Sequence, residues 1–170
     1  PAGDRQSLFP GILKVARLGY DGKGQAQVAT LADAVAAFER FSRERAGAHA
    51  AGRADSAAVP CVLERRLDLA CEISVVVARA DDGTAVTFPV GTNVHRDGIL
   101  ASTTVPADID TSLAGRARRD ALTIAERLGY VGVLCVEFFV LADGTLVANE
   151  MAPLPHNSGH WSIEAATTSQ

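Results

Sequence analysis

The apolar run at residues 131–141, VGVLCVEFFVL, constrains the fold more than any other stretch of the sequence. Its β-branched and aromatic residues favour a strand, and the near absence of polar residues predicts that this strand is buried. Glu137 is the single charge in the run, and an isolated buried charge is costly unless a partner compensates it. The run therefore predicts a central strand whose one carboxylate has a specific partner.

The residues after this run indicate what that partner is. Asp143 and Gly144 are a common hairpin turn signal, so residues 145–149 are expected to return antiparallel and deliver Glu150 beside Glu137. Two neighbouring carboxylates suit Mg²⁺, which takes one or two carboxylates together with phosphate oxygens. A zinc site is not expected, because the sequence lacks cysteine or histidine at ligand spacing. The alternative is that Glu137 pairs with an arginine.

A polar segment follows at residues 149–161, NEMAPLPHNSGHW. Its two prolines remove amide donors and favour extended conformations in the preceding residues, so we expect a stiff, extended loop and no helix. Binding residues concentrate on loops held by a rigid scaffold, and this loop combines a carboxylate, amides and two imidazoles. The alternative, a packed surface loop around a buried tryptophan, does not account for these polar groups.

The N-terminal part of the chain predicts a strand, a glycine loop and a second strand. Residues 11–17 are β-favourable and contain Lys14, residues 19–24 are GYDGKG, and residues 25–28 form the second strand. Glycines let backbone amides approach an anion closely, and Lys23 adds a charge. The chain has no lysine other than these two, beside fourteen arginines. The alternative is an ordinary glycine-rich hairpin turn.

The other segments mix helices and strands, as in an α+β fold. Helices are predicted at residues 30–45 and 108–128, and further strands at residues 59–69, 71–80, 84–90 and 101–105. The buried face of the first helix is expected to carry Leu31, Val35, Phe38 and Phe41, and that of the second Leu113, Ala117, Ala121, Ile124, Ala125 and Leu128. Thr30 or Asp33 is expected to cap the first helix, and Gly129 to end the second. Residues 46–58 have few large apolar side chains and predict a mobile linker.

Composition excludes several classes of function. A chain of 170 residues is long enough for one ordinary domain or two small lobes with a sizeable core. A formal net charge of −4 gives no electrostatic reason to expect nucleic acid or an anionic membrane as partner. Three separate cysteines predict buried thiols in a reducing compartment. No apolar run approaches the roughly 20 residues needed to span a bilayer, so a cytoplasmic protein is expected.

The strand lysine, the glycine loop, the paired carboxylates and the polar loop together are suited to holding Mg-ATP between two lobes. The sequence resembles the ATP-grasp family of 5-(carboxyamino)imidazole ribonucleotide synthases of purine biosynthesis. The matching stretches, in the family's order and over nearly the whole chain, are LFPGILKVARLGYDGKGQ, ERRLDLACEISV, NVHRDGIL, LGYVGVLCVEFFV and NEMAPLPHNSGHW. The closing HNSGH run distinguishes this family from related carboxylases and peptide-type ligases.

The resemblance implies an ATP-grasp fold of the α+β class, in which antiparallel sheets of two α+β lobes grip ATP. Residues 1–69 would form the smaller lobe, with the glycine-rich loop and the linker near residues 46–58. Residues 70–170 would form the larger lobe, with the magnesium and bicarbonate site. The family's N-terminal and C-terminal domains are absent from this sequence.

The resemblance also implies the residues that bind ATP and magnesium. The residues assigned to ATP are Lys14, Gly22, Lys23, Gly24, Glu64, Leu67, Glu72 and His95. Lys14 would hold a phosphate, the residues around Glu64 would meet the adenine, and Glu72 would accept hydrogen bonds from the ribose hydroxyls. Glu137 and Glu150 would bind Mg²⁺.

The residues implied for catalysis are Tyr20, Lys23, His156 and Asn157. Tyr20 and Lys23 would lie over the phosphates and the ribonucleotide, whereas His156 and Asn157 would meet bicarbonate or carboxyphosphate. One residue departs from the family pattern, because Leu154 stands where the family has an arginine.

The implied reaction is the ATP-dependent carboxylation of 5-aminoimidazole ribonucleotide with bicarbonate. Carboxyphosphate is the intermediate, and the products are 5-(carboxyamino)imidazole ribonucleotide, ADP and phosphate. The full-length protein is expected to be a homodimer. The alternative suggested by Leu154 is a catalytically weakened ATP-grasp module that binds nucleotide in a regulatory or interaction role.

Overall fold

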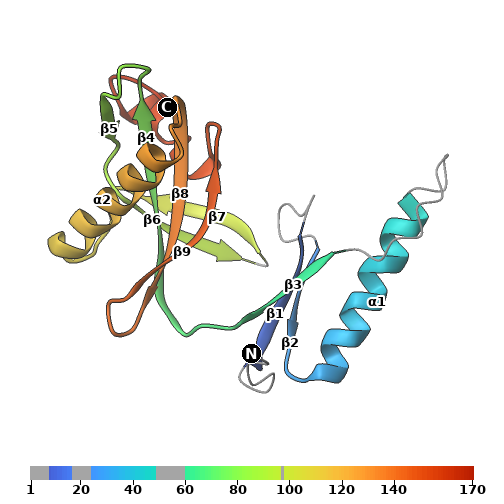
Figure 1. The fold of residues 1–170 in the computed structure, drawn as a ribbon. Helices are drawn as coiled ribbons and strands as arrows, with labels where there is room; N and C mark the ends of the chain where they lie inside the picture. The colour runs from blue at the N-terminus through green and yellow to red at the C-terminus, as the bar shows by residue number, and fades with distance from the viewer. Residues whose placement is uncertain (1–7, 17–23, 49–59, 97) are drawn as a thin grey trace. The chain divides into compact units, whose positions relative to one another are not determined.

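A computed structural model describes residues 8–16, 24–48, 60–96 and 98–170. The chain divides into two compact units, Pro1–Leu67 and Asp68–Gln170. Each unit has its own antiparallel sheet, and a helix packs against one face of each sheet (Figure 1). No helix of the described ranges is both long and apolar enough to cross a membrane.

The N-terminal unit contains a three-stranded sheet and one helix. The strands are β1 (Gly11–Val15), β2 (Gln25–Val28) and β3 (Cys61–Arg65), in the order β2-β1-β3, and α1 spans Leu31–Ala48. Antiparallel neighbours flank β1 on both sides. This arrangement makes β1 the central strand, so its side chains have the most fixed positions in the sheet.

Alternation along the strands decides which side chains meet α1. Leu13 is buried against the helix with Val28 and Phe41, and Leu63 of β3 packs at the edge of this cluster. Successive side chains of a strand point to opposite faces, so Lys14 lies on the face away from α1. The helix thereby leaves one face of this sheet available for a polar site.

The prediction for the buried face of α1 is wrong at two positions. Leu31 and Val35 are 65% and 49% exposed, whereas Ala34, Ala37 and Phe41 are buried. Both sets have helical spacing, and the sheet packs against the set whose small alanines allow a close approach.

The predicted cap of α1 is confirmed. Thr30 Oγ1 accepts a hydrogen bond from Asp33 N at 3.2 Å, and Asp33 Oδ2 accepts one from Thr30 N at 2.9 Å. Each side chain satisfies a backbone donor of the other residue, as in a capping box.

The C-terminal unit contains a six-stranded sheet in the order β7-β6-β4-β8-β9, with β5 paired to β4. The strands are β4 (Leu69–Arg79), β5 (Ala85–Thr87), β6 (Gly91–Arg96), β7 (Ile99–Thr104), β8 (Gly132–Leu141) and β9 (Leu146–Ala152), and α2 spans Thr111–Arg127. The strands β4 and β8 pair over most of their length. They form the centre of the sheet, as the apolar run at residues 131–141 predicts.

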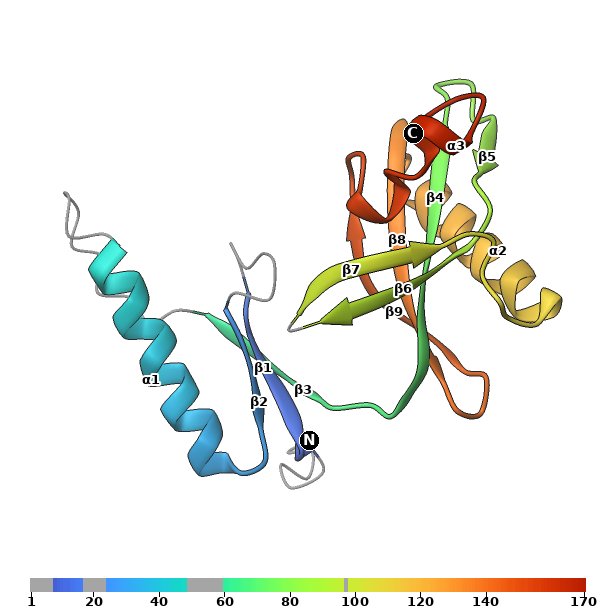
Figure 2. The same cartoon turned by 180° about the vertical axis from the view of Figure 1, so that it is seen from behind.

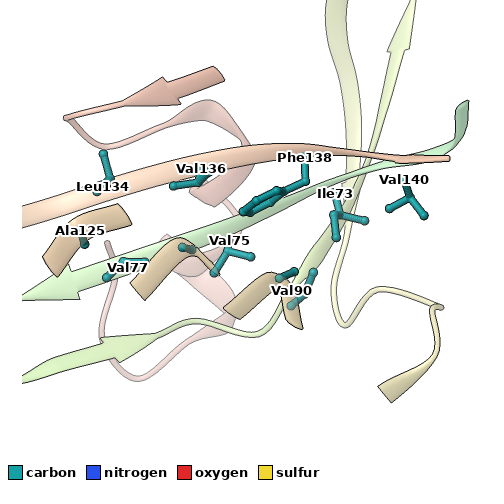
Figure 3. Packing of buried hydrophobic residues seen from close by; sticks show 11 residues of the cluster. Ile73, Val75, Val77, Val90, Ala125, Leu134, Val136, Phe138 and Val140 are labelled. Carbon is teal, nitrogen blue, oxygen red and sulfur yellow. The ribbon is translucent and has the colours of Figure 1, made fainter. Parts of the chain in front are cut away.

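The main core lies between α2 and one face of this sheet (Figure 3). Its buried residues are Ile73, Val75 and Val77 of β4, Val90, Leu134, Val136, Phe138 and Val140 of β8, and Ala117, Ala121 and Ala125 of α2. Fully burying one such Val, Leu, Ile or Phe side chain stabilises a fold by roughly 1.5–3 kcal/mol. Because every second residue of β4 and β8 enters this core, the residues between them face the other side.

Several predicted boundaries differ from the structure where caps and turns lie. The second helix begins at Thr111, because Asp110 accepts a hydrogen bond from Ser112 N at 2.7 Å and caps it. The prediction that Leu128 lies on the buried face of this helix is wrong, because Leu128 lies at the helix end and is 55% exposed. Gly129 has a φ of +58°, which confirms the left-handed end of this helix.

The strand predicted at residues 59–69 is also shorter than expected, since β3 spans only Cys61–Arg65, and β6 pairs antiparallel with β7.

The prediction of buried cysteines is confirmed only for Cys135. Cys61 and Cys71 are half-buried, because Cys61 lies on the edge strand β3 and Cys71 lies at an irregular end of β4. Burial is the main cause that raises the pKa of all three thiols, to about 12 for Cys135.

The segment at residues 149–161 is not the extended loop that its prolines predict. Strand β9 continues through Glu150 to Ala152, a 3₁₀ turn η2 spans Asn157–Gly159, and a short helix α3 spans Ser162–Ala165. Both prolines lie between β9 and η2, where neither removes a hydrogen bond from these elements. The chain therefore folds back at this point, and Figure 2 shows η2 and α3 on the side of the sheet away from α2.

The pairing of β8 with β9 contains one irregularity. Glu137 lies opposite Glu150, but the next residue, Phe138, lies opposite Ala148. Asn149 has no directly opposite partner, which is the arrangement of a β-bulge.

The close packing of α2 gives a test of this core. Ala121→Leu adds three carbon atoms at a position that is 0% exposed, so we expect the free energy of unfolding to fall by about 1–3 kcal/mol. Arg118→Leu, at an exposed position of the same helix, is the control and should change it by less than about 0.5 kcal/mol. Urea unfolding measures both values. Equal effects would show that α2 does not pack against the sheet as described.

Candidate functional site

The face of the C-terminal sheet away from α2 carries a group of polar side chains from four strands. Ser74 of β4 lies opposite Glu137 of β8, Glu72 of β4 lies opposite Asn93 of β6, and Glu137 lies opposite Glu150 of β9. Directly paired residues of antiparallel strands share a face. The predicted neighbourhood of Glu137 and Glu150 is therefore confirmed, and two uncharged polar residues accompany them.

Glu137 is buried, with 6% of its surface exposed, and its partner is an amide. Asn93 Nδ2 donates to Glu137 Oε1 at 3.0 Å. Ser74 Oγ and Thr103 Oγ1 both donate to Asn93 Oδ1, at 3.3 and 3.0 Å, and so fix which end of the amide faces the carboxylate. No arginine or lysine of the described ranges lies within ion-pair distance of Glu137, so the arginine alternative has no support among these residues.

The electrostatics of this site disfavour a negative charge on Glu137. The pKa of Glu137 is raised to about 7, mainly by burial and also by the charges of Glu150 and Glu72, while the hydrogen bond from Asn93 acts in the opposite direction. The free-energy cost of burying a charged carboxylate is offset when the carboxylate binds a cation or a proton. The carboxylates of Glu137 and Glu150 thus form a site with affinity for positive charge.

The donor set indicates which cations fit. In the part of the chain that the structure describes, no three His, Cys, Asp or Glu side chains are placed to enclose a metal ion. Structural zinc needs four ligands, usually Cys or His. Two carboxylates suit a hard cation that keeps oxygen ligands from water or phosphate.

Glu72 and His95 form a second pair on this face. His95 Nδ1 lies 2.9 Å from Glu72 Oε2, and the two side chains are 24% and 27% exposed. The alignment does not make a hydrogen bond, and His95 Nδ1 is without one among the described residues. Neither side chain is fully satisfied by the other, so both retain capacity for a polar ligand.

The turn η2 brings a histidine to the same carboxylate. His156 Nδ1 lies 3.9 Å from Glu137 Oε1 and 2.9 Å from Ser158 Oγ. Burial lowers the pKa of His156, while Glu150 acts in the opposite direction. His156 is therefore neutral near pH 7. Asn157 is exposed, and its Oδ1 accepts a hydrogen bond from Ser158 N at 2.9 Å.

Lys14 forms the corresponding feature of the N-terminal unit. Lys14 lies opposite Val62, two residues from Glu64, on the face of the sheet away from α1. Lys14 Nζ lies 2.7 Å from Glu64 Oε2, and the side chains are 28% and 46% exposed. Ion pairs this exposed contribute little to stability, typically below about 1 kcal/mol. The partly exposed side chains of Lys14 and Glu64 are therefore accessible to a ligand.

The other predicted residues of the N-terminal unit have varied positions. Leu67 is half-buried between β3 and β4, and Gly24 adopts a φ of +77° at the start of β2. An added Cβ at Gly24 would overlap the side chain of Val15, so glycine is required there. Tyr20, Gly22 and Lys23 lie outside the described residues.

Sequence reasoning missed Asn93, Ser74 and Ser158 as members of the site. Ser74 had a detectable signal, because it is a polar residue within the apolar strand CEISVVVARA, as Glu137 is within its own run. Asn93 had none, since its role depends on a strand pairing with β4 that is distant in sequence.

Each unit has an antiparallel sheet with a helix on one face and charged residues on the other. This architecture is consistent with one family of nucleotide-binding proteins. Residues 5–170 match the family model of the ATP-grasp domain, so the chain belongs to the ATP-grasp family. The predicted fold class is confirmed by this match.

Two curated relatives within this family share a name. The chain is 48% identical over 162 residues to N5-carboxyaminoimidazole ribonucleotide synthase of Brucella melitensis, covering 94% of this chain and 41% of that protein. It is 37% identical over 165 residues to the Bacillus subtilis protein of the same name, covering 95% of this chain and 39% of that protein. The chain thus spans about two fifths of the length of these relatives.

Solved structures agree with the sequence relatives. An ADP complex of an N5-carboxyaminoimidazole ribonucleotide synthetase superposes with a TM-score of 0.78 at 38% identity, covering 95% of this chain and 39% of that chain. The Staphylococcus aureus enzyme with ADP gives 0.76 at 35% identity, covering 92% and 37%. The predicted family resemblance is confirmed.

The raised pKa of Glu137 gives a test with a defined sign. Its pKa is about 7 in the folded chain against an ordinary value of 4.5, so the folded chain binds more protons between these pH values. The stability that this group contributes is fully present below about pH 4.5 and is lost as the pH rises through 7. We expect Glu137→Gln to remove a pH-dependent decrease on the order of 3 kcal/mol from the metal-free protein.

Urea unfolding with a chelator, from pH 5 to 8, measures this difference. Glu126→Gln, at an exposed position of α2, is the matched control and should leave the pH profile unchanged. Parallel profiles for the wild type and Glu137→Gln would contradict the burial of an unpaired carboxylate.

Proposed function

We propose that this chain is the ATP-grasp part of an enzyme that carboxylates 5-aminoimidazole ribonucleotide, using ATP and bicarbonate. The observation that carries this proposal is the buried Glu137, which lies opposite Glu150 and 3.9 Å from the neutral His156. A polar site of this kind within a chain 48% identical to a synthase supports the same chemistry here. The relatives are longer than this chain, so other parts of such an enzyme would contribute to the whole reaction. ATP binding and phosphoryl transfer are the steps proposed for the residues of this chain.

Glu137 and Glu150 would hold Mg²⁺, with phosphate oxygens completing the ligands. When bound, the ion offsets the charge on the transferring phosphoryl group. Asn93 supports this role, since its amide donates to Oε1 of Glu137 and fixes the orientation of the carboxylate. A ligand whose orientation is fixed in advance loses less entropy on binding the ion.

Residues 1–69 would be the smaller lobe and residues 70–170 the larger, and each lobe has its own candidates for binding ATP. Lys14, which Glu64 holds at 2.7 Å, would meet a phosphate. Gly22, Lys23 and Gly24 would contribute backbone amides and a further charge.

The nucleoside of ATP would meet the remaining residues. Glu64 and Leu67 would contact the adenine, Glu72 would accept hydrogen bonds from the ribose hydroxyls, and His95 would support Glu72.

The chemistry begins with bicarbonate, which is a poor electrophile. A bicarbonate oxygen attacks the terminal phosphorus of ATP, and ADP leaves as carboxyphosphate forms. The amine of the ribonucleotide then attacks the carboxyl carbon and displaces phosphate, or it adds to the carbon dioxide that carboxyphosphate releases together with phosphate. In either route the amine loses one proton, which phosphate can accept. His156 and Asn157 would hold the bicarbonate, and Tyr20 and Lys23 would lie over the phosphates and the ribonucleotide.

One observation favours a second candidate function. Leu154 lies two residues before His156 and is 54% exposed. The family has an arginine at the position of Leu154. Leucine offers no charge to an anion, and losing one positioned donor can cost about 10²–10³ in rate. The second candidate is a nucleotide-binding module with weakened catalysis and a regulatory or interaction role.

Nucleotide binding can be tested on the chain itself. Mg-ATP at about 100 times its Kd should add about 2.7 kcal/mol of stability and raise the melting temperature by several degrees. Glu150→Gln should remove the part of this increase that depends on Mg²⁺, whereas Glu164→Gln, at an exposed position of α3, should not. An unchanged Mg²⁺ response in Glu150→Gln would remove Glu150 from the metal site.

Catalysis requires a longer chain that includes the flanking regions of the relatives. We expect phosphate release that depends on bicarbonate and 5-aminoimidazole ribonucleotide, and a rise of about 10²-fold or more on Leu154→Arg. If neither version releases phosphate while both bind Mg-ATP, the binding module is the correct function. A homodimer of this longer protein, measured by light scattering, is also expected.

A further inference from the structure

Ser158 lies at the centre of a short hydrogen-bonded chain that ends at His156. Its side chain is buried, with 1% exposed, and its Oγ lies 2.9 Å from His156 Nδ1 and 3.5 Å from Cys135 Sγ. Ser158 has no reactive role in the proposed reaction. A buried hydroxyl with two partners instead orients them.

The backbone of Ser158 sets the direction of the hydrogen bond. Ser158 N donates to His156 Nδ1 at 3.3 Å, and His156 thereby caps the turn η2. A backbone N–H can only donate, so this contact favours an accepting Nδ1 that carries no proton. In a neutral imidazole the proton is then on Nε2, which makes no hydrogen bond to any residue that the structure describes.

Neighbouring groups are consistent with this assignment. Glu137 Oε1 is 3.9 Å from Nδ1, which is too far for the carboxylate to accept a hydrogen bond from a proton there. Ser158 N also donates to Asn157 Oδ1 at 2.9 Å, so its N–H is shared, and the hydroxyl of Ser158 can donate to Nδ1 as well. Both donors of Ser158 then meet the same acceptor.

The backbone of His156 is held from the other side. Gln170 Oε1 accepts from His156 N at 3.1 Å, and Gln170 Nε2 donates to His156 O at 2.6 Å. Gly159 makes room for this amide, because a Cβ there would overlap the side chain of Gln170. Ser162 Oγ donates to Gly159 O at 2.7 Å and accepts from Gln170 N at 3.1 Å.

We propose that Ser158 is a positioning residue that fixes neutral His156 as the Nε2–H tautomer, so that His156 meets an anionic oxygen of the substrate as a hydrogen-bond donor. The substrate part rests on the proposed function, whereas the tautomer is a property of the free protein. A donor aimed at developing negative charge stabilises a transition state without taking a proton. His156 thus acts on the carboxyphosphate side as an electrostatic group and not as a base.

The tautomer can be measured directly by long-range ¹H–¹⁵N NMR of the ¹⁵N-labelled chain at pH 7.5. We expect an unprotonated Nδ1 and a protonated Nε2 for His156, assigned with His156→Gln. A protonated Nδ1 in the wild type would overturn the proposal, whether or not any variant folds. This measurement uses no substrate, so its result is independent of the proposed function.

Two serine variants then separate positioning from general stability. Ser158→Ala should produce a mixture of both tautomers, because the hydroxyl donor is lost and one shared N–H remains. Ser162→Ala removes an equally buried hydroxyl that does not touch the imidazole, and should keep the Nε2–H form. Equal spectra for the wild type and Ser158→Ala would overturn the role of Ser158.

The role of His156 is tested in the longer chain with flanking regions. His156→Gln keeps a donor near the position of Nε2 and should retain phosphate release within about tenfold, whereas His156→Glu, which can accept a proton but not donate one when ionised, should lose about 10²–10³-fold. Higher activity in His156→Glu than in His156→Gln would overturn the donor role. Absence of phosphate release in the wild type would instead contradict the proposed function.

Discussion

The burial of Glu137 on the face of the sheet away from α2 is the constraint on which the site depends. The apolar core between α2 and the sheet fixes Val136 and Phe138 on one side, so Glu137 must lie on the other. Asn93, which Ser74 and Thr103 hold in place, donates a hydrogen bond to Oε1 of Glu137. The other carboxylate oxygen of Glu137 has no protein donor among the described residues. Packing on one face of a strand thereby determines the electrostatics of the other.

The N-terminal unit uses the same division of faces on a smaller scale. Leu13 faces α1 and its neighbour Lys14 faces away, toward Glu64. In both units a helix stabilises the sheet, and the opposite face carries the charged residues. The exposed Lys14–Glu64 pair contributes little to stability, so these two residues can change at small cost to the fold, whereas the buried Glu137 cannot.

Sequence patterns could predict the fold wherever periodicity and turn residues agree. The apolar run and the Asp143-Gly144 turn correctly predicted that Glu137 and Glu150 are neighbours. Periodicity alone could not choose between two stripes on α1, and Leu31 and Val35 were wrongly placed in the core. The turn η2 and the role of Asn93 depend on contacts between distant segments, which no local pattern contains.

The β-bulge at Asn149 has a consequence for how this site can change in length. Leu146 packs at the edge of the core under α2, while Glu150 shares the opposite face with Glu137. In a regular strand two residues four positions apart point to the same side, so both placements hold only because one extra residue resets the alternation. Deleting a single residue between Leu146 and Glu150 would turn either the leucine outward or the carboxylate inward, and no point substitution could restore both. The segment therefore tolerates changes of side chain far better than changes of length.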